Sequence, residues 1–183
     1  MNEITYMNDI TYMNNDPTKP IIYIGVIFFC CKNNKIRFLL MENDLTKYED
    51  IGLDICKSNN ICDILRIHTN YLIDLELGDL SKLYSKDIYL SQELSLIKFI
   101  SAPENIINLK NEDFGTYTVI SNDKKIKRRI NWIERDYILK VLSKFNKLSK
   151  RLNKKEIMDT FRNIEVETNI NNVLKLIHKK MFN

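Results

Sequence analysis

Residues 48 to 70 hold the side chains whose types and spacing come closest to a catalytic motif. The stretch begins Tyr48-Glu49-Asp50-Ile51-Gly52-Leu53, and apolar residues then recur at 61, 64, 65 and 67, a spacing that fits one face of a helix. An extended apolar segment precedes it, so the order is strand, acidic turn with one glycine, helix. Carboxylates beside such a turn are the ligands that hard divalent cations prefer. Glu49 and Asp50 are therefore either candidate metal ligands or solvated turn residues that cap the next turn.

This order resembles the catalytic box of the Nudix hydrolases, and Glu49 to Gly52 resembles the Glu-Asp-Ile-Gly-Gly form found in Nudix-like proteins of large DNA viruses. Other landmarks of the same viral family follow in order. They are Phe114-Gly115-Thr116-Tyr117, Arg128 to Ile133, and Leu148-Ser149-Lys150-Arg151-Leu152, and the resemblance covers roughly residues 21 to 152. It implies a mixed sheet between helices. It also implies hydrolysis, with Mg²⁺ or Mn²⁺, of nucleoside diphosphates linked to another moiety, including mRNA caps.

The box itself departs from the family pattern at its acidic positions. Nudix chemistry needs two or more carboxylates on the helix to hold a metal ion against a diphosphate. In this degenerate box Gly52 keeps the first glycine, Leu53 replaces the second, and Asn59 stands at the first glutamate. The Arg-Glu pair falls on Ile67-His68, or on Arg66-Ile67 if one residue is deleted. Between Ile55 and Ile73 the only acid is Asp63. We therefore expect no catalytic residues and no cofactor, unless Glu49 and Asp50 join acids from later loops in a relocated site for Mg²⁺ or Mn²⁺. His68 and His178 are expected to be ordinary helix residues.

The strongest binding signal is basic. Residues 124 to 155 hold 13 basic and 2 acidic side chains, a net charge of +11 in a chain of net charge +4. Residues 156 to 183 are balanced, so residues 1 to 123 carry −7. Such segregation indicates an anionic partner, RNA or another polyanion. The alternative is a solvated hairpin and helix face. The candidate nucleic-acid-binding residues are Lys124, Lys125, Lys127, Arg128, Arg129, Lys140, Lys144, Lys147 and Arg151.

The last four of these residues recur along one side of a segment, 134 to 152, that has the clearest helical period in the chain. Tyr137, Phe145 and Leu152 belong to its opposite, apolar side. The pattern predicts a single helix from Glu134 to Leu152. Further helices are predicted at 154–164 and 170–182.

Strands are predicted from apolar runs bounded by turn residues. The run 21–31 fits a strand buried on both faces, and 32–35 a turn that returns it as a strand at 36–41. Residues 95–101 form a strand that Pro103 ends, 104–110 a short helix or turn, and 72–84 a strand and loop. Trp132, between Ile130 and Ile133, is expected in the core rather than as a base-stacking platform.

The predicted fold class is α+β, a Nudix-like mixed β-sheet sandwiched by helices with extra C-terminal helices. We assign residues 1–18, an imperfect six-residue repeat, to a disordered or low-complexity tail. Residues 19–152 form the Nudix-like domain and residues 153–183 a C-terminal helical extension.

Composition bounds the remaining possibilities. Four cysteines without metal-ligand spacing fit reduced, buried thiols, and no apolar run has the roughly 18 residues of a membrane span. We see no secretory signal, and we expect a cytoplasmic protein, in the host cytoplasm or the virion if viral.

Three functional hypotheses follow. The first is a catalytically inactive Nudix-like protein, of viral origin, that binds RNA or a phosphorylated ligand through a basic C-terminal face. The second is a metal-dependent Nudix hydrolase with a relocated site. The third is a virion scaffold without a ligand. The sequence does not name the ligand, a protein partner or the oligomeric state.

Overall fold

A computed structural model describes residues 20–43, 46–54, 84–108, 116–121 and 124–165, and the single positions 178 and 181. At 53, 54, 105, 116–121 and 124–128 only the backbone is described. The predicted tail 1–18, the box helix after 54 with Asn59, Arg66 and His68, the segment 72–83 and most of the last helix lie outside these residues.

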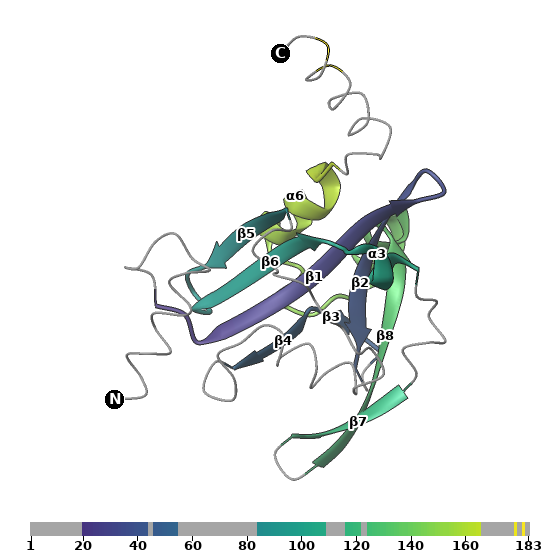
Figure 1. Cartoon of the computed structure of the whole chain (residues 1–183). Helices are drawn as coiled ribbons and strands as arrows, with labels where there is room; N and C mark the ends of the chain where they lie inside the picture. Colours follow the sequence, from purple (N-terminus) through teal and green to yellow (C-terminus); the bar gives the residue numbers. More distant parts are fainter. Residues whose placement is uncertain are drawn as a thin grey trace.

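The described strands form one mixed sheet in the order β5-β6-β1-β2-β8-β7, with β3 paired to β2 and β4 to β1 (Figure 1). The strands are β1 (Tyr23–Lys32), β2 (Lys35–Glu42), β3 (Tyr48–Glu49), β4 (Ile51–Asp54), β5 (Ser85–Leu90), β6 (Ser95–Ser101), β7 (Thr116–Ser121) and β8 (Lys124–Glu134). The helices are α3 (Glu104–Ile107), α5 (Arg135–Tyr137), the π-helix η2 (Ile138–Leu142) and α6 (Lys155–Asn163). Only β1 and β6 run parallel among these pairs. The α+β class is confirmed.

The predicted hairpin of residues 21 to 41 is confirmed as β1 and β2. Asn33 and Asn34 both have positive φ, 53° and 60°, the backbone that a two-residue type I′ turn requires. Beyond the turn the two strands diverge. Near the turn β1 pairs with β2, but its first half, Tyr23 to Val26, pairs with β4 instead.

Residues 48–54 fill the gap between the diverging strands. Tyr48 and Glu49 pair with β2, and Ile51 to Asp54 pair with β1. The prediction of an acidic turn at this place is wrong, because the segment is extended and Gly52 lies inside a strand. Its backbone groups find partners in two strands at once, which a solvated turn would not need.

Alternation along the strands gives the sheet two apolar faces. On one face Phe28, Leu39 and Trp132 are buried together with Ile106 of α3. On the other face Phe29, Phe38 and Phe99 pack against the helical segments η2 and α6. Phe161 of α6 makes edge-to-face contacts with Phe38 at 4.8 Å and Phe99 at 5.4 Å between ring centroids. The predicted strand 95–101 and the predicted helix 154–164 are confirmed by β6 and α6.

The predicted helix from Glu134 to Leu152 is wrong in its second half. Helical hydrogen bonding ends where the amide of Lys147 donates to the carbonyl of Leu142 and Asn146 takes the left-handed conformation, φ 54°. This is the arrangement that ends helices at an asparagine or glycine. The chain then reverses, and residues 147–149 run beside Tyr48 as a parallel bridge.

Two of the four cysteines lie in the described part of the chain. Cys30 lies in the core and Cys31 is half-buried, and neither is in a disulfide; Cys56 and Cys62 lie outside the described residues. Burial raises the pKa of the Cys30 thiol to about 11, so it stays protonated and unreactive near neutrality.

No helix in the described part of the chain is long and apolar enough to cross a membrane.

Trp132 provides the test of this core. It is 9% exposed and packs among strand residues, so the expectation of a core tryptophan is confirmed. Trp132→Ala is expected to lower the free energy of unfolding by about 3–5 kcal/mol, as large-to-small aromatic changes do. Tyr84→Ala is the control, since Tyr84 is 63% exposed. Thermal or denaturant unfolding measures both, and a Trp132→Ala protein that melts with the wild type but loses RNA binding would contradict the core assignment.

Candidate functional site

Asp50 lies where the extended segment changes its partner from β2 to β1. Its side chain is 0% exposed. The hydroxyl of Tyr23 donates a 2.6 Å hydrogen bond to one carboxylate oxygen, and Nη1 of Arg151 donates a 3.1 Å hydrogen bond to the other. A buried carboxylate is expensive to desolvate unless a cation and hydrogen bonds compensate it. Asp50 has both kinds of partner.

Two glycines make room for this carboxylate. Gly25 of β1 and Gly52 of β4 are directly paired across the strands. A Cβ atom on Gly25 would overlap the carboxylate of Asp50, and one on Gly52 would overlap the hydroxyl of Tyr23. The Asp50 carboxylate and the Tyr23 hydroxyl therefore occupy space that side chains at positions 25 and 52 would fill.

Arg151 connects the buried carboxylate to the surface. Its guanidinium carbon lies 3.7 Å from the centroid of the Tyr23 ring, a cation–π stack, and its Nε lies 3.6 Å from an oxygen of Glu93. Glu93 also pairs with Lys154 at 3.6 Å. Burial by itself lowers the pKa of Arg151, but Asp50, Tyr23 and Glu93 together raise it above the ordinary value, so this arginine is always charged.

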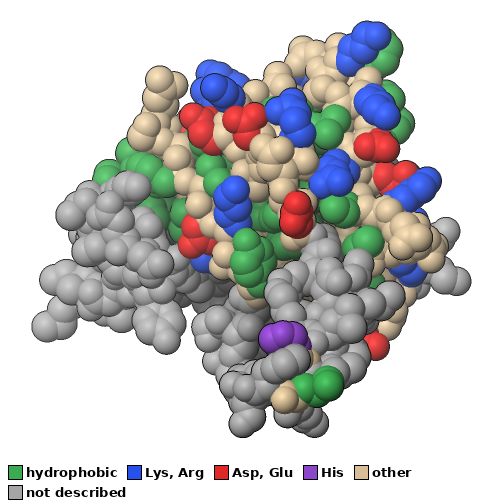
Figure 2. Space-filling view, turned by 90° about the horizontal axis from the view of Figure 1, so that it is seen from above, with side chains coloured by type: hydrophobic (Ala, Val, Ile, Leu, Met, Phe, Trp, Pro, Cys, Tyr) green, Lys and Arg blue, Asp and Glu red, His purple; other side chains and the backbone are tan. Residues whose placement is uncertain are grey.

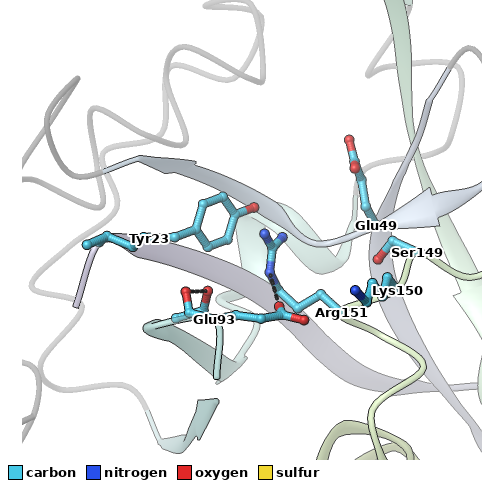
Figure 3. Close-up of a pocket in the computed structure, with 8 residues that line it drawn as sticks. Tyr23, Glu49, Glu93, Ser149, Lys150 and Arg151 are labelled. Carbon is cyan, nitrogen blue, oxygen red and sulfur yellow. Dashed lines mark hydrogen bonds and ion pairs between the residues drawn. The ribbon is translucent and has the colours of Figure 1, made fainter. Parts of the chain in front are cut away.

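A pocket of about 430 Å³ opens beside this network (Figure 3). Arg151 lies between Tyr23 and Glu93 in the pocket wall, while the side chain of Glu49 points away from Arg151. Its lining residues are Ile22, Tyr23, Glu49, Glu93, Ser95, Ser149, Lys150 and Arg151. The two cations in this lining are matched by two carboxylates, so its charge is nearly balanced.

Glu49 and Asp50 therefore have different roles from those that sequence spacing indicated. The reading of Asp50 as a solvated turn residue is wrong, since it is fully buried against Tyr23 and Arg151. Its oxygens are directed at those partners rather than at a space that Glu49 shares. Within the described residues no group of three or more His, Cys, Asp or Glu side chains is placed to hold a metal ion.

The first basic candidates lie on β8. Lys124, Lys125, Lys127 and Arg128 pair with β7, and the far ends of these two strands extend away from the rest of the sheet (Figure 1). Arg129 pairs with both β7 and β2, and its side chain is exposed. Arg129 is thus the point where the run of basic residues reaches the body of the sheet.

The second set of candidates does not form one helix face. We call residues 135–146, which comprise α5, η2 and the turns after it, the helical segment. Lys140 and Lys144 lie on this segment and are exposed, and Lys140 is in a loose 3.9 Å pair with Asp136. Lys147 is also exposed but follows the reversal, and its Nζ lies 3.3 Å from Oγ1 of Thr46. Arg151 is mostly buried in the Asp50 network. Three of the four residues thus remain on the surface.

Strand register brings the two basic sets together. Arg129 pairs with Glu42, Glu42 with Tyr48, and Tyr48 with Leu148. Three strand spacings of about 4.8 Å put the backbone of Arg129 roughly 14 Å from residue 148. Arg129 and Lys147 are 18 positions apart in the sequence, and in the structure they lie on the same part of the sheet, separated by β2 and β3. We call Arg129, Lys140, Lys144 and Lys147 the basic surface.

Charge elsewhere on the surface is mixed. On the face seen in Figure 2, Lys and Arg side chains stand among Asp and Glu side chains. An exposed ion pair on α6, Arg162 with Asp159, is an example at 2.9 Å. Attraction of a polyanion must therefore come from a local cluster of unpaired cations, not from the overall charge.

Sequence reasoning missed several residues of this region. Tyr23 and Glu93 lie far from Arg151 in the chain, and no local pattern relates them. A signal was present at Gly25, which lies in the predicted strand 21–31, where glycine often marks close backbone approach, whereas Gly52 was assigned to a turn. Asn146 likewise carries a helix-ending signal that the apolar period obscured.

Comparisons with protein-family models, with curated proteins and with solved structures give no match for this chain.

Arg151 gives the test of the network. Arg151→Met is expected to lower the free energy of unfolding by about 3–5 kcal/mol, because it leaves the Asp50 carboxylate buried without its cation. Lys150→Met is the matched control, since Lys150 is the exposed neighbour and its change should stay within about 0.5 kcal/mol. Adding Asp50→Asn to Arg151→Met should recover part of the loss, because a neutral amide needs no cation. Equal melting temperatures for Arg151→Met and the wild type would contradict this account.

Proposed function

We propose that this protein binds RNA, or a comparable phosphorylated polyanion, through the basic surface, on a Nudix-like fold that has lost the glutamates of its catalytic box. The observation that carries the proposal is the strand register that puts Arg129 and residues 147–149 on one sheet, separated by β2 and β3. Lysine and arginine bind nucleic acid mainly by neutralising phosphates and releasing condensed counterions. Clustered exposed cations from several elements supply that interaction.

The size of the surface fits several phosphates. Its width across β8, β2, β3 and residue 148 is roughly 14 Å by strand spacing. This width is larger than the separation of neighbouring phosphates in a nucleic-acid strand, so the surface can contact more than one phosphate. Lys140 and Lys144 extend the surface along the helical segment, and the run of basic residues at 124–128 extends it along β8.

The Nudix-like part of the proposal is supported by the order of elements. A hairpin, β1 and β2, leads into the Glu-Asp-Ile-Gly segment, and these strands belong to a mixed sheet with α3 on one face and η2 and α6 on the other. The family's Arg-x-Ile-x-Trp-Ile landmark coincides with β8. Its Leu-Asn-x-Arg-Leu ending corresponds to 148–152, with Ser149 in place of the asparagine, and contains the mostly buried Arg151. The glutamates that would make such a fold an enzyme are missing from the sequence between Ile55 and Ile73.

The pocket is a poorer choice for a polyanion than the basic surface. Arg151 is already committed to Asp50, and Glu49 and Glu93 offset the remaining positive charge of the lining. A phosphate there would meet carboxylates as well as cations. Lys140, Lys144 and Lys147 face solvent. Within the described residues, the only ion pair that any of them forms with a carboxylate is the 3.9 Å contact of Lys140 with Asp136.

We expect no hydrolysis from this protein. With Mg²⁺ or Mn²⁺ present, capped RNA, ADP-ribose and nucleoside triphosphates should remain intact, because Asn59 and residues 66–72 supply no carboxylates to bind the metal. Chromatographic analysis of each substrate after incubation measures this. Turnover that Glu49→Gln abolishes without loss of folding would favour the hydrolase with a relocated metal site.

RNA binding has its own test. The triple variant Lys140→Glu, Lys144→Glu, Lys147→Glu should lose RNA binding with little change in Tm, since exposed charges contribute little to stability. For the wild type, the logarithm of affinity should fall with the logarithm of salt concentration by about 0.7 per phosphate contacted on a single strand. Fluorescence anisotropy with a labelled RNA at several salt concentrations measures both.

A matched control keeps the change in net charge the same. Lys35→Glu, Lys86→Glu and Lys155→Glu place the same charge reversals on β2, β5 and α6, and all three lysines are exposed. This variant should retain most of the affinity. Loss of binding in both triple variants would indicate non-specific attraction, and absence of binding by the wild type at low salt would leave the virion scaffold as the better interpretation.

A further inference from the structure

Two large aromatic side chains are exposed on the same helical segment as Lys140 and Lys144. Tyr137 is 48% exposed and Phe145 is 63% exposed. Other side chains of the segment are buried in the core, since Ile138 is 0% and Leu142 is 2% exposed. The apolar period of residues 134–152 predicts that Tyr137 and Phe145 face the core, but in the structure both side chains are exposed.

The backbone explains the exposure. The amide of Ser143 donates to the carbonyl of Ile138, a π-helical bond that widens the turn by one residue relative to an α-helix. The amide of Phe145 then donates to the carbonyl of Val141. Tyr137, Val141 and Phe145 therefore follow one another at single-turn spacing along one side. The reversal at Asn146 holds Phe145 at the end of the segment, next to Lys147.

The neighbours of these aromatics are cations from the basic surface. Lys144 precedes Phe145, and Lys147 follows it by two residues. At the other end, α5, which carries Tyr137, packs against β2, and β2 pairs with Arg129 of β8. The acids near by are Glu42, on β2, and Asp136, which is loosely paired with Lys140.

We propose that Tyr137 and Phe145 are a stacking platform for unpaired bases, so that the polyanion bound here is single-stranded RNA rather than duplex. This inference rests on the proposed function and narrows it. Proteins that bind single strands combine cations that follow the backbone with aromatic rings on which bases stack. Bases inside a duplex are already stacked and do not reach such rings. The exposed Tyr137 and Phe145, with the exposed Lys140 and Lys144 on the adjacent side, supply both components on one segment.

A protein partner fits these residues less well. Surfaces that dock proteins usually present contiguous apolar area. Here the apolar strip is narrow, because Val141 between the two rings is half-buried, and the exposed Lys140 and Lys144 flank it and add positive charge.

The experiment compares single-stranded and duplex RNA of equal length by fluorescence anisotropy. Phe145→Ala and Tyr137→Ala should each lower affinity for the single strand by about tenfold, as expected for the loss of one base stack. Neither change should alter the salt dependence, because an aromatic ring neutralises no phosphate. Affinity for the duplex should stay unchanged. Tyr84→Ala is the matched control, an equally exposed aromatic at 63%, outside the helical segment, and it should bind both RNAs as the wild type does.

Phe145→Trp adds a readout that a purely structural role would not change. The chain's one natural tryptophan, Trp132, is buried, so the new indole reports on its own site. Its emission should be quenched by single-stranded RNA and not by duplex, with affinity retained.

Unchanged single-strand affinity in both alanine variants, or an equal loss with duplex, would overturn the platform. If the lysine triple variant still abolished binding in that case, the basic surface would stand without the platform. Absence of RNA binding by the wild type would overturn both. Binding of an acidic protein that depends on Phe145, with no effect on RNA, would also overturn the platform.

Discussion

The structure depends on one buried charge that cannot be left unpaired. Asp50 lies in the gap between two diverging strands, and its carboxylate has lost all contact with water. Only a cation can compensate it fully, and that cation comes from 101 positions further along the chain. Arg151 suits the place because its planar guanidinium can bond the carboxylate and stack on Tyr23 together, which a lysine ammonium cannot do.

This pairing also fixes the segment that carries the exposed cations. Since Arg151 is held against the sheet, residues 147–149 must leave the helical direction and run beside Tyr48. Asn146 makes that reversal, and the π-helical turn before it sets which side chains face outward. The same reversal brings Lys147 next to β3 and leaves Lys144 and Phe145 at the exposed end of the segment. A structural ion pair thus positions the surface to which we assign RNA binding.

Sequence patterns predicted the parts of this fold that depend on neighbours in the chain. The hairpin of β1 and β2, the strand that Pro103 ends, and the buried Trp132 follow from runs, turn residues and local apolarity. The helix from 134 to 152 was predicted too long, because its apolar period continues past the point where Asn146 ends it. Leu148 and Leu152 are buried as that period required, but in a reversed chain. The pairing of Asp50 with Arg151 has no local signature, so the sequence placed Asp50 in a solvated turn and Arg151 on a solvated face.

By residue type and spacing, Lys140, Lys144, Lys147 and Arg151 are equivalent. They differ in solvent exposure, because the three lysines are exposed and Arg151 is mostly buried. A solvated cation interacts only weakly with the other charges of the protein and is available to a phosphate, whereas one that faces a buried carboxylate is bound as part of the fold. Replacing Arg151 therefore removes a support of the whole C-terminal segment, and any loss of RNA binding that follows would be indirect. Replacing the three lysines removes only charge that solvent already screens. This difference is the physical reason to assign the ligand to the lysines and the architecture to the arginine.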